Sequence, residues 1–201
     1  MRPFSKRTPG DRSTAASRAK AASSPGDHAL SPTSAVTIRR LGPDDASAFR
    51  TLRLDGLARH PEAFGASWEA DSGQPPAWFA ATLESQAVFG AWWGEGELVG
   101  IVGLHVPEAP KLRHKGVLWG MFVRPDARGA GLGSALIAAV LAHAAGCVED
   151  VGLSVGAANH GAIRRYAAAG FVPYGLEPRA LKIDDVFYDE VLMSLRLDRQ
   201  G

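Results

Sequence analysis

The residues whose types and spacing point most directly to chemistry are 128–134, which read RGAGLGS and lie between two apolar segments. Three glycines at the start of a predicted helix leave backbone N–H groups open to a close-approaching anion. The helix dipole adds about half a positive charge at that end, and Arg128 adds a whole one. The sequence therefore predicts a loop that binds a pyrophosphate. A tight strand-to-helix turn without a ligand is the alternative interpretation.

Two better-known phosphate-binding loops do not match this stretch. A P-loop needs Lys and then Ser or Thr after its last glycine, but Ser134 follows Gly133 directly. A dinucleotide fingerprint needs G-x-G-x-x-G, and Ser134 stands where its third glycine belongs. The pattern that does fit is R-x-x-G-x-G/A, at Arg128, Gly131 and Gly133.

Two regular elements must hold this loop in place. The apolar run 118–123 predicts a buried strand, which ends at Arg124-Pro125 because proline cannot continue a hydrogen-bonded ladder. The segment 132–144 predicts a helix with one apolar face, since its large apolar residues are three and four positions apart: Leu132, Leu136, Ile137, Val140, Leu141 and Ala144.

A second motif follows at residues 159–171. Asn159 begins a predicted helix over 162–169, Tyr166 lies within it, and Gly170-Phe171 ends it. Together with the first motif, this stretch resembles the GCN5-related N-acetyltransferase (GNAT) family, whose second motif reads N-x-x-A-x-x-x-Y-x-x-x-G-F. The two motifs occur in the family's order and spacing, and the resemblance covers most of residues 36–197.

The resemblance implies a co-substrate, acetyl-CoA, and no metal. In such a site Asn159 would bond the pantetheine arm or the diphosphate. Tyr166 would act as the general acid for the departing thiol. Glu69 falls where the family's helical substrate wall usually supplies a base. The remaining residues implied to bind the cofactor are Met121, Phe122, Val123, Arg128, Gly129, Ala130, Gly131, Leu132, Gly133 and Ser134.

The identity of the base stays open. An alkylamine with a pKa near 10.4 must lose a proton before it attacks, at a cost of about 4.6 kcal/mol at pH 7. Besides Glu69, the sequence offers Glu108 and His105, and His160 beside Asn159 is expected to face solvent. Many members of the family use ordered water instead of a side chain. Trp119 is a candidate wall of an amine pocket.

The predicted fold class is α/β. Strands are expected at 36–41, 87–92, 98–106, 118–123, 151–155, 171–174 and 187–197, and helices at 46–60, 67–71, 77–85, 132–144 and 162–169, with loops at 107–116 and 177–186. The resemblance implies the GNAT fold, a mixed, mostly antiparallel sheet of six to seven strands flanked by helices. In that fold the strands at 118–123 and 151–155 splay apart in a V. Pantetheine amides would satisfy the backbone groups that the splay leaves unpaired.

Composition divides the chain in two. Residues 1–34 hold six of the 22 Lys and Arg residues, are rich in Ser, Ala and Pro, and lack apolar periodicity, which predicts a disordered tail before a domain at 35–198. An organellar transit peptide is the alternative for this tail. The rest is mildly acidic, which disfavours nucleic acid as a partner, and no apolar run is long enough to span a membrane. Cys147, the one cysteine, is expected to be a small buried residue in a reducing, cytoplasmic compartment.

The resemblance, together with these observations, implies an N-acetyltransferase that passes an acetyl group from acetyl-CoA directly to a primary amine. The acceptor is a small molecule or a protein or peptide, and the sequence does not distinguish them. The alternative is a catalytically silent CoA-binding sensor with the same fold. The resemblance also leaves a homodimer open as the assembly.

Overall fold

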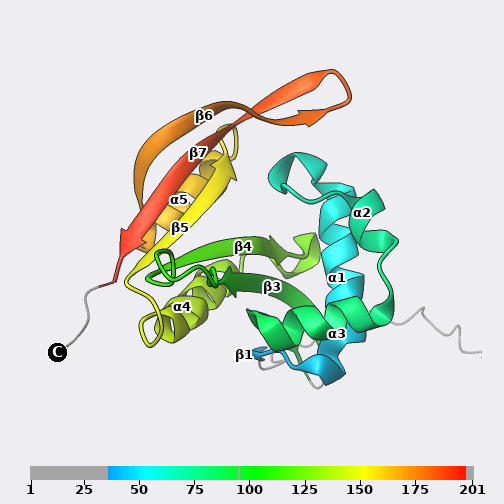
Figure 1. Cartoon of the computed structure of the whole chain (residues 1–201). Helices are drawn as coiled ribbons and strands as arrows, with labels where there is room; N and C mark the ends of the chain where they lie inside the picture. The colour runs from blue at the N-terminus through cyan, green and yellow to red at the C-terminus, as the bar shows by residue number, and fades with distance from the viewer. Residues whose placement is uncertain (1–35, 95, 198–201) are drawn as a thin grey trace, which may run out of the picture. The chain divides into compact units, whose positions relative to one another are not determined.

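The protein is described here by a computed structural model over residues 36–94 and 96–197. The tail predicted for residues 1–34 lies outside the described residues. A seven-stranded sheet runs through the described part, with helices against both of its faces (Figure 1). This arrangement confirms the predicted α/β class.

The sheet is mixed, and one pair of its strands is parallel. All neighbouring strands are antiparallel except β4 and β5. In spatial order the strands are β1 (Val36–Arg40), β2 (Ala87–Trp93), β3 (Glu97–His105), β4 (Lys115–Val123), β5 (Asp150–Gly156), β7 (Val186–Arg196) and β6 (Val172–Ile183).

The parallel pair stays together over a short stretch only. Residues 115–117 of β4 pair in order with residues 150–152 of β5, and beyond them the two strands have no further paired residues. The rest of both strands therefore diverges, which confirms the predicted V-shaped splay. Backbone N–H and C=O groups along the two inner edges are left without a ladder partner inside the splay.

Helices cover the sheet in two groups, each over its own hydrophobic cluster. On one face α1 (Ala46–Arg59) and α3 (Pro76–Ser85) pack through Phe49, Leu52 and Phe79, with α2 (Trp68–Ser72) beside α1. On the other face α4 (Leu132–Ala144) and α5 (His160–Ala168) pack on a second cluster. The described residues also contain three single-turn helices: η1 (Pro43–Asp45), η2 (Pro61–Ala63) and η3 (Pro125–Ala127).

The apolar face predicted for α4 is the face that packs on the sheet. Leu136, Ile137, Val140 and Ala144 are each at most 1% exposed. Burial of such side chains contributes about 1.5–3 kcal/mol each for the larger ones. The helix is therefore anchored along its length, and its N-terminal end is held at the open end of β4.

The boundaries predicted for two loops are wrong. β4 begins at Lys115, inside the predicted loop 107–116, and β6 runs to Ile183, through most of the predicted loop 177–186. β6 is an edge strand with mostly exposed residues, so its sequence lacks the alternation that marks a half-buried strand. Pro178 and Arg179, which has a φ of 57°, interrupt the pairing with β7 as a bulge.

The prediction for Cys147 is also wrong. Its side chain is exposed, because α4 ends at Ala144 and Cys147 lies in the turn after it. The thiol donates to the carbonyl of His143 at 3.3 Å. None of the helices in residues 36–94 and 96–197 has the length and apolar character needed to cross a bilayer.

Candidate active site

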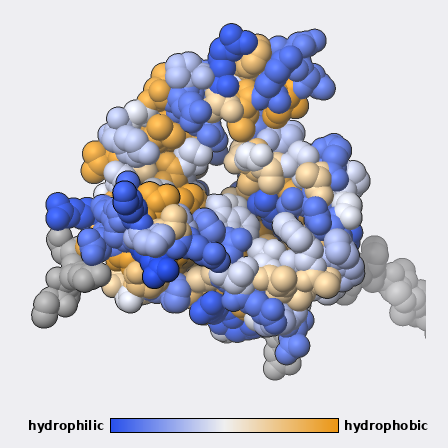
Figure 2. Space-filling model, in the orientation of Figure 1, coloured by the Kyte–Doolittle hydropathy of each residue, from blue (hydrophilic) through white to orange (hydrophobic). Residues whose placement is uncertain are grey.

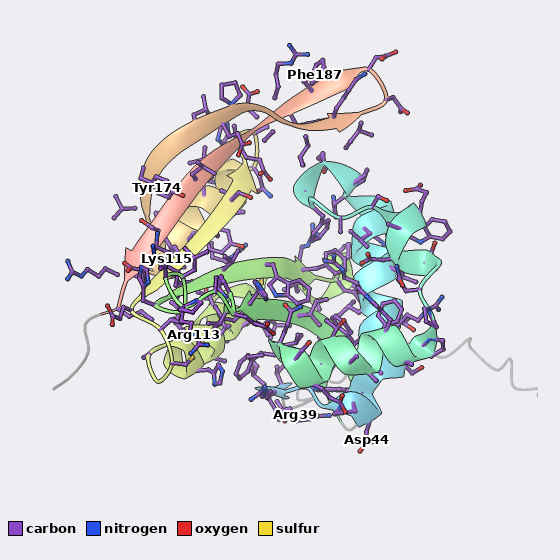
Figure 3. All side chains as sticks on the ribbon, viewed as in Figure 1. Arg39, Asp44, Arg113, Lys115, Tyr174 and Phe187 are labelled. Atoms are coloured by element: carbon purple, nitrogen blue, oxygen red, sulfur yellow. The ribbon has the colours of Figure 1, made fainter. Side chains whose placement is uncertain are left out.

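A cavity of about 1030 Å³ occupies the splay between β4 and β5. Its walls come from β4, η2, the loop that leads into α4, the end of β5, α5 and the start of β7. The space-filling view shows a hollow between the β6–β7 hairpin and the helices α1 and α2 (Figure 2). Phe187, which lines the cavity, lies toward the far end of that hairpin (Figure 3).

The glycine-rich loop forms one end of this cavity. Gly129 and Gly131 have φ values of 89° and 76°, which only glycine adopts without strain, and a Cβ at either would meet nothing within 4 Å. The first hydrogen bond of α4 runs from the Ala135 N–H to the Gly131 carbonyl. The N–H groups of the first helical turn therefore lack intrahelical partners, and their residues line the cavity.

The structure brings together most of the residues predicted to bind the cofactor. Ala130 is the one predicted residue that does not line the cavity. Those that do are Met121, Phe122, Val123, Arg128, Gly129, Gly131, Leu132, Gly133, Ser134 and Asn159. The open space at the loop, the N–H groups and the unpaired edge of β4 together fit a long, phosphorylated ligand with amides in its arm.

The side chain of Arg128 is exposed, and one of its N–H groups is hydrogen-bonded to the end of β4. Its Nε–H donates to the carbonyl of Val123 at 3.1 Å, and Nη2 lies 3.3 Å from Nε2 of His60. The guanidinium therefore bridges from the glycine-rich loop to the end of α1. In the sequence, position 60 is only the last residue of the predicted helix 46–60.

Arg165 is a cavity residue that the sequence analysis did not identify. A Cβ added to Gly133 would lie 3.0 Å from Arg165 Nε and 3.3 Å from Met121 Cε, so the guanidinium of Arg165 reaches the first turn of α4. Ala162, Arg165 and Tyr166 all line the cavity. Their spacing of three and four residues places them on one helix face, and this spacing was the available signal.

Tyr166 lies deep in the cavity wall. The residue is 7% exposed, and its ring packs edge-on against Phe171 with centroids 5.8 Å apart. Burial raises the pKa of the Tyr166 phenol to about 12, with a smaller opposing effect from the charge of Arg165. The phenol is therefore protonated at neutral pH and can act as a proton donor.

Asn159 caps α5 as the second motif predicts. Its Oδ1 accepts the N–H of Ala162 at 3.0 Å. The amide oxygen is thus used within the protein, while the side-chain NH₂ keeps donors for a ligand in the cavity that Asn159 lines.

The acidic residues at the cavity differ from the one named as a base. Glu69 is exposed on α2 and is not among the residues that line the cavity. His105, Glu108 and His160 do not line it either. Two other carboxylates do, Glu62 on η2 and Asp189 on β7.

Trp119 contributes to the cavity wall, in agreement with the sequence analysis. Its indole lies over Gly103 on β3, where an added Cβ would come within 2.2 Å of the ring. Arg53 stacks on the indole at 5.4 Å, and the Trp119 Nε1–H is buried without a hydrogen-bond partner in the described residues. This part of the cavity wall is therefore aromatic, and the guanidinium of Arg53 packs against the Trp119 indole.

Comparisons with known proteins decide the family. The sequence model of the Acetyltransferase (GNAT) family matches residues 54–171. The chain belongs to the GNAT acetyltransferase family. The match begins within α1, ends at Phe171 and includes both motifs.

Curated relatives of this GNAT chain include mycothiol acetyltransferases. The one from Streptomyces scabiei is 34% identical over 145 residues, which is 69% of this chain and 44% of that protein. The one from Cellulomonas flavigena is 32% identical over 161 residues, again 44% of its length. The chain thus spans less than half the length of these relatives.

Solved structures show the same fold. A GNAT-family acetyltransferase from Streptococcus pneumoniae superposes with a TM-score of 0.73 at 23% identity, over 82% of this chain and all of that one. A putative acetyltransferase from Salmonella typhimurium, solved with its cofactor acetyl-CoA, gives 0.69 at 20% identity, over 84% and 97%. Within the described residues, no group of His, Cys, Asp and Glu side chains is arranged to hold a metal ion.

Proposed function

We propose that this GNAT chain is an acetyl-CoA-dependent N-acetyltransferase that acts on a primary amine of a small molecule or of a protein or peptide. One observation carries the proposal: a single cavity contains the glycine-rich loop, the open edge of β4 and the buried phenol of Tyr166. Each of these is a part that thioester-to-amine transfer needs. Relatives named mycothiol acetyltransferase support the reaction class.

We infer that acetyl-CoA would lie along this cavity. The diphosphate would lie on the N–H groups of Leu132, Gly133 and Ser134, with Arg128 and Arg165 supplying charge. The pantetheine arm would pair with β4 at Met121–Val123, where β5 has left the ladder. This assignment places the thioester toward the deeper part of the splay, where Tyr166 lies.

The reaction proposed is direct transfer. The neutral amine attacks the thioester carbonyl, a C–N bond forms, and the C–S bond breaks. Tyr166 donates its proton to the leaving thiolate, which becomes the CoA thiol, and regains a proton that the amine nitrogen loses. The buried phenol is protonated at neutral pH, so it can donate a hydrogen bond and then its proton to the sulfur as negative charge develops there.

The first experiment follows thiol release from acetyl-CoA with a panel of amines, corrected for hydrolysis, for wild type, Tyr166→Phe and Arg128→Ala. We expect release with some amines, slowed by Tyr166→Phe at nearly constant acetyl-CoA affinity. Arg128→Ala should instead weaken acetyl-CoA binding. Arg164→Ala is the matched control, because Arg164 is exposed on α5 and does not line the cavity.

Binding is measured separately from turnover. Acetyl-CoA at a hundred times its Kd should stabilise the wild type by about 2.7 kcal/mol, a clear rise in melting temperature. Stabilisation without thiol release from any amine would favour the silent CoA-binding sensor. Absence of stabilisation would contradict both functions.

A further inference from the structure

Besides Tyr166, the cavity is lined by another titratable residue, His60, at the end of α1. Its Nε2 lies 3.3 Å from Nη2 of Arg128, and its Nδ1 lies 3.5 Å from Oε1 of Glu62. The imidazole also packs against the ring of Phe122 on β4, with centroids 6.1 Å apart. His60, Glu62, Phe122 and Arg128 all line the cavity. The imidazole therefore has Arg128 within hydrogen-bond distance of Nε2, the Glu62 carboxylate near Nδ1 and Phe122 near its ring.

The chemistry of these partners defines the proton positions. An arginine in a protein only donates hydrogen bonds, so Nε2 of His60 must accept from Arg128. The ring proton then resides on Nδ1, which faces the carboxylate of Glu62. This is the neutral tautomer with a lone pair on Nε2, the form in which a histidine acts as a base.

The other proton acceptors at the cavity are less suited. Asp189 accepts the backbone N–H of Arg179 at 2.7 Å, so its Oδ1 is already engaged within the protein. Glu62 faces the Nδ1 side of His60. Glu69, the base named from the sequence, does not line the cavity.

We propose that His60 is the general base that takes the proton from the acceptor ammonium, with Glu62 as its positioning residue. This inference rests on the proposed N-acetyltransferase function. The N–H bond of the ammonium breaks, its electron pair stays on nitrogen, and the proton moves to Nε2 of His60. The imidazolium is stabilised by Glu62 and later returns the proton to solvent.

Arg128 connects this base to the cofactor end of the cavity. The same guanidinium that occupies Nε2 of His60 belongs to the loop assigned to the diphosphate. A phosphate that attracts Arg128 releases the lone pair of His60. The base is thereby uncovered when the diphosphate of acetyl-CoA, or of CoA, is bound. The charged groups that contact His60 are Glu62 from η2 and Arg128 from the loop before α4.

The test uses His60→Gln, Glu62→Gln and the control His105→Gln in the full chain. Glutamine at position 60 retains an oxygen that can accept from Arg128, but it does not take up a proton near neutral pH. His105 is exposed at the end of β3 and does not line the cavity. We measure kcat and KM for an accepted amine across pH, the Kd of CoA by calorimetry, and the ¹⁵N shifts of the His60 ring by NMR.

We expect His60→Gln to lower kcat/KM for the amine by about 10²- to 10⁴-fold and to remove the acid limb of its pH profile. Its Kd for CoA should stay within about twofold of wild type. Glu62→Gln should lower kcat about tenfold, with part of the loss restored in Glu62→Asp. In wild type the ¹⁵N shifts should show the Nδ1–H tautomer at neutral pH.

Three results would overturn the inference. A His60→Gln enzyme with the wild-type rate and pH profile would leave the proposed function intact and assign the proton to water or another group. An equal loss in His105→Gln would mean that the effect is not specific to the cavity. A wild type that binds no acetyl-CoA or releases no thiol would contradict the proposed N-acetyltransferase, and the inference with it.

Discussion

A buried ion pair between α1 and α2 tests how the cavity wall at Phe64 and Trp119 is supported. Arg53 Nε lies 3.0 Å from Asp71 Oδ2, with side-chain exposures of 10% and 9%. The guanidinium also stacks at 5.6 Å on Phe64 and at 5.4 Å on Trp119, both cavity residues. Asp71 therefore anchors the cation that supports this wall.

Replacing Asp71 with Asn keeps the shape and removes the charge. Arg53 then stays buried without its counter-ion, which costs about 3–5 kcal/mol in comparable pairs. For a domain of this size, about 1 kcal/mol corresponds to roughly 2–4 °C in Tm, so the expected loss is roughly 6–20 °C. By contrast, replacing both partners with leucine should be close to neutral, since no buried charge remains.

The assay is urea unfolding followed by circular dichroism, together with a thermal melt. Asp55→Asn is the matched control: Asp55 pairs with Arg59 at 2.6 Å, but the side chains are 31% and 56% exposed. That exposed pair should contribute about 0.3–0.5 kcal/mol. If Asp71→Asn lost no more stability than Asp55→Asn, the inferred burial and geometry of the Arg53–Asp71 pair would be wrong.

Three further predictions concern the cavity and the sheet beneath it. Because the pKa of Tyr166 is raised from about 10 to about 12, the folded state holds the proton more tightly above pH 10, so wild type should lose about 2 kcal/mol more unfolding free energy than Tyr166→Phe by pH 12. Parallel slopes of the two proteins in alkaline denaturation would contradict the buried phenol. Arg165→Gln should weaken CoA binding roughly tenfold or more in calorimetry but leave the binding of S-acetylpantetheine, which has no diphosphate, unchanged; Arg164→Gln should alter neither. Gly103→Ala should cost about 1–3 kcal/mol in urea unfolding, since the new Cβ would lie 2.2 Å from the facing indole, whereas Gly65→Ala, with nothing within 4 Å, should change stability by no more than about 0.5 kcal/mol.

The glycine-rich loop and the start of α5 could be predicted from the sequence because the residue patterns that mark them are local. The run 128–134 combines glycines, an arginine and the start of a helix, and the structure has Gly131 as the N-terminal cap with φ of 76°. Asn159 likewise caps α5 within the motif that contains Tyr166. In each case the backbone conformation and the helix end depend on residues a few positions apart.

The positions of Glu69 and of strand β6 were predicted less well. Glu69 was named from its place in a predicted helix, but the direction of a side chain from a five-residue helix depends on how α2 packs against α1. Edge strand β6 was missed beyond residue 174 because it forms by pairing with β7, and exposed edge strands show no apolar alternation. Local patterns do not encode such pairings.

The sequence by itself predicted the α/β class and the glycine-rich loop at the start of a helix, and through the resemblance to the GNAT family it implied the splayed strands and the role of Tyr166. The class and the loop follow from periodicity, from glycine's access to positive φ and from helix-end chemistry, all of which act over short separations. Only the tertiary structure decided that His60, Glu62, Arg128 and Arg165 meet at one cavity. They come from α1, η2, the loop before α4 and α5, and long-range packing of the sheet brings them together, because side-chain contacts between distant segments depend on the completed core.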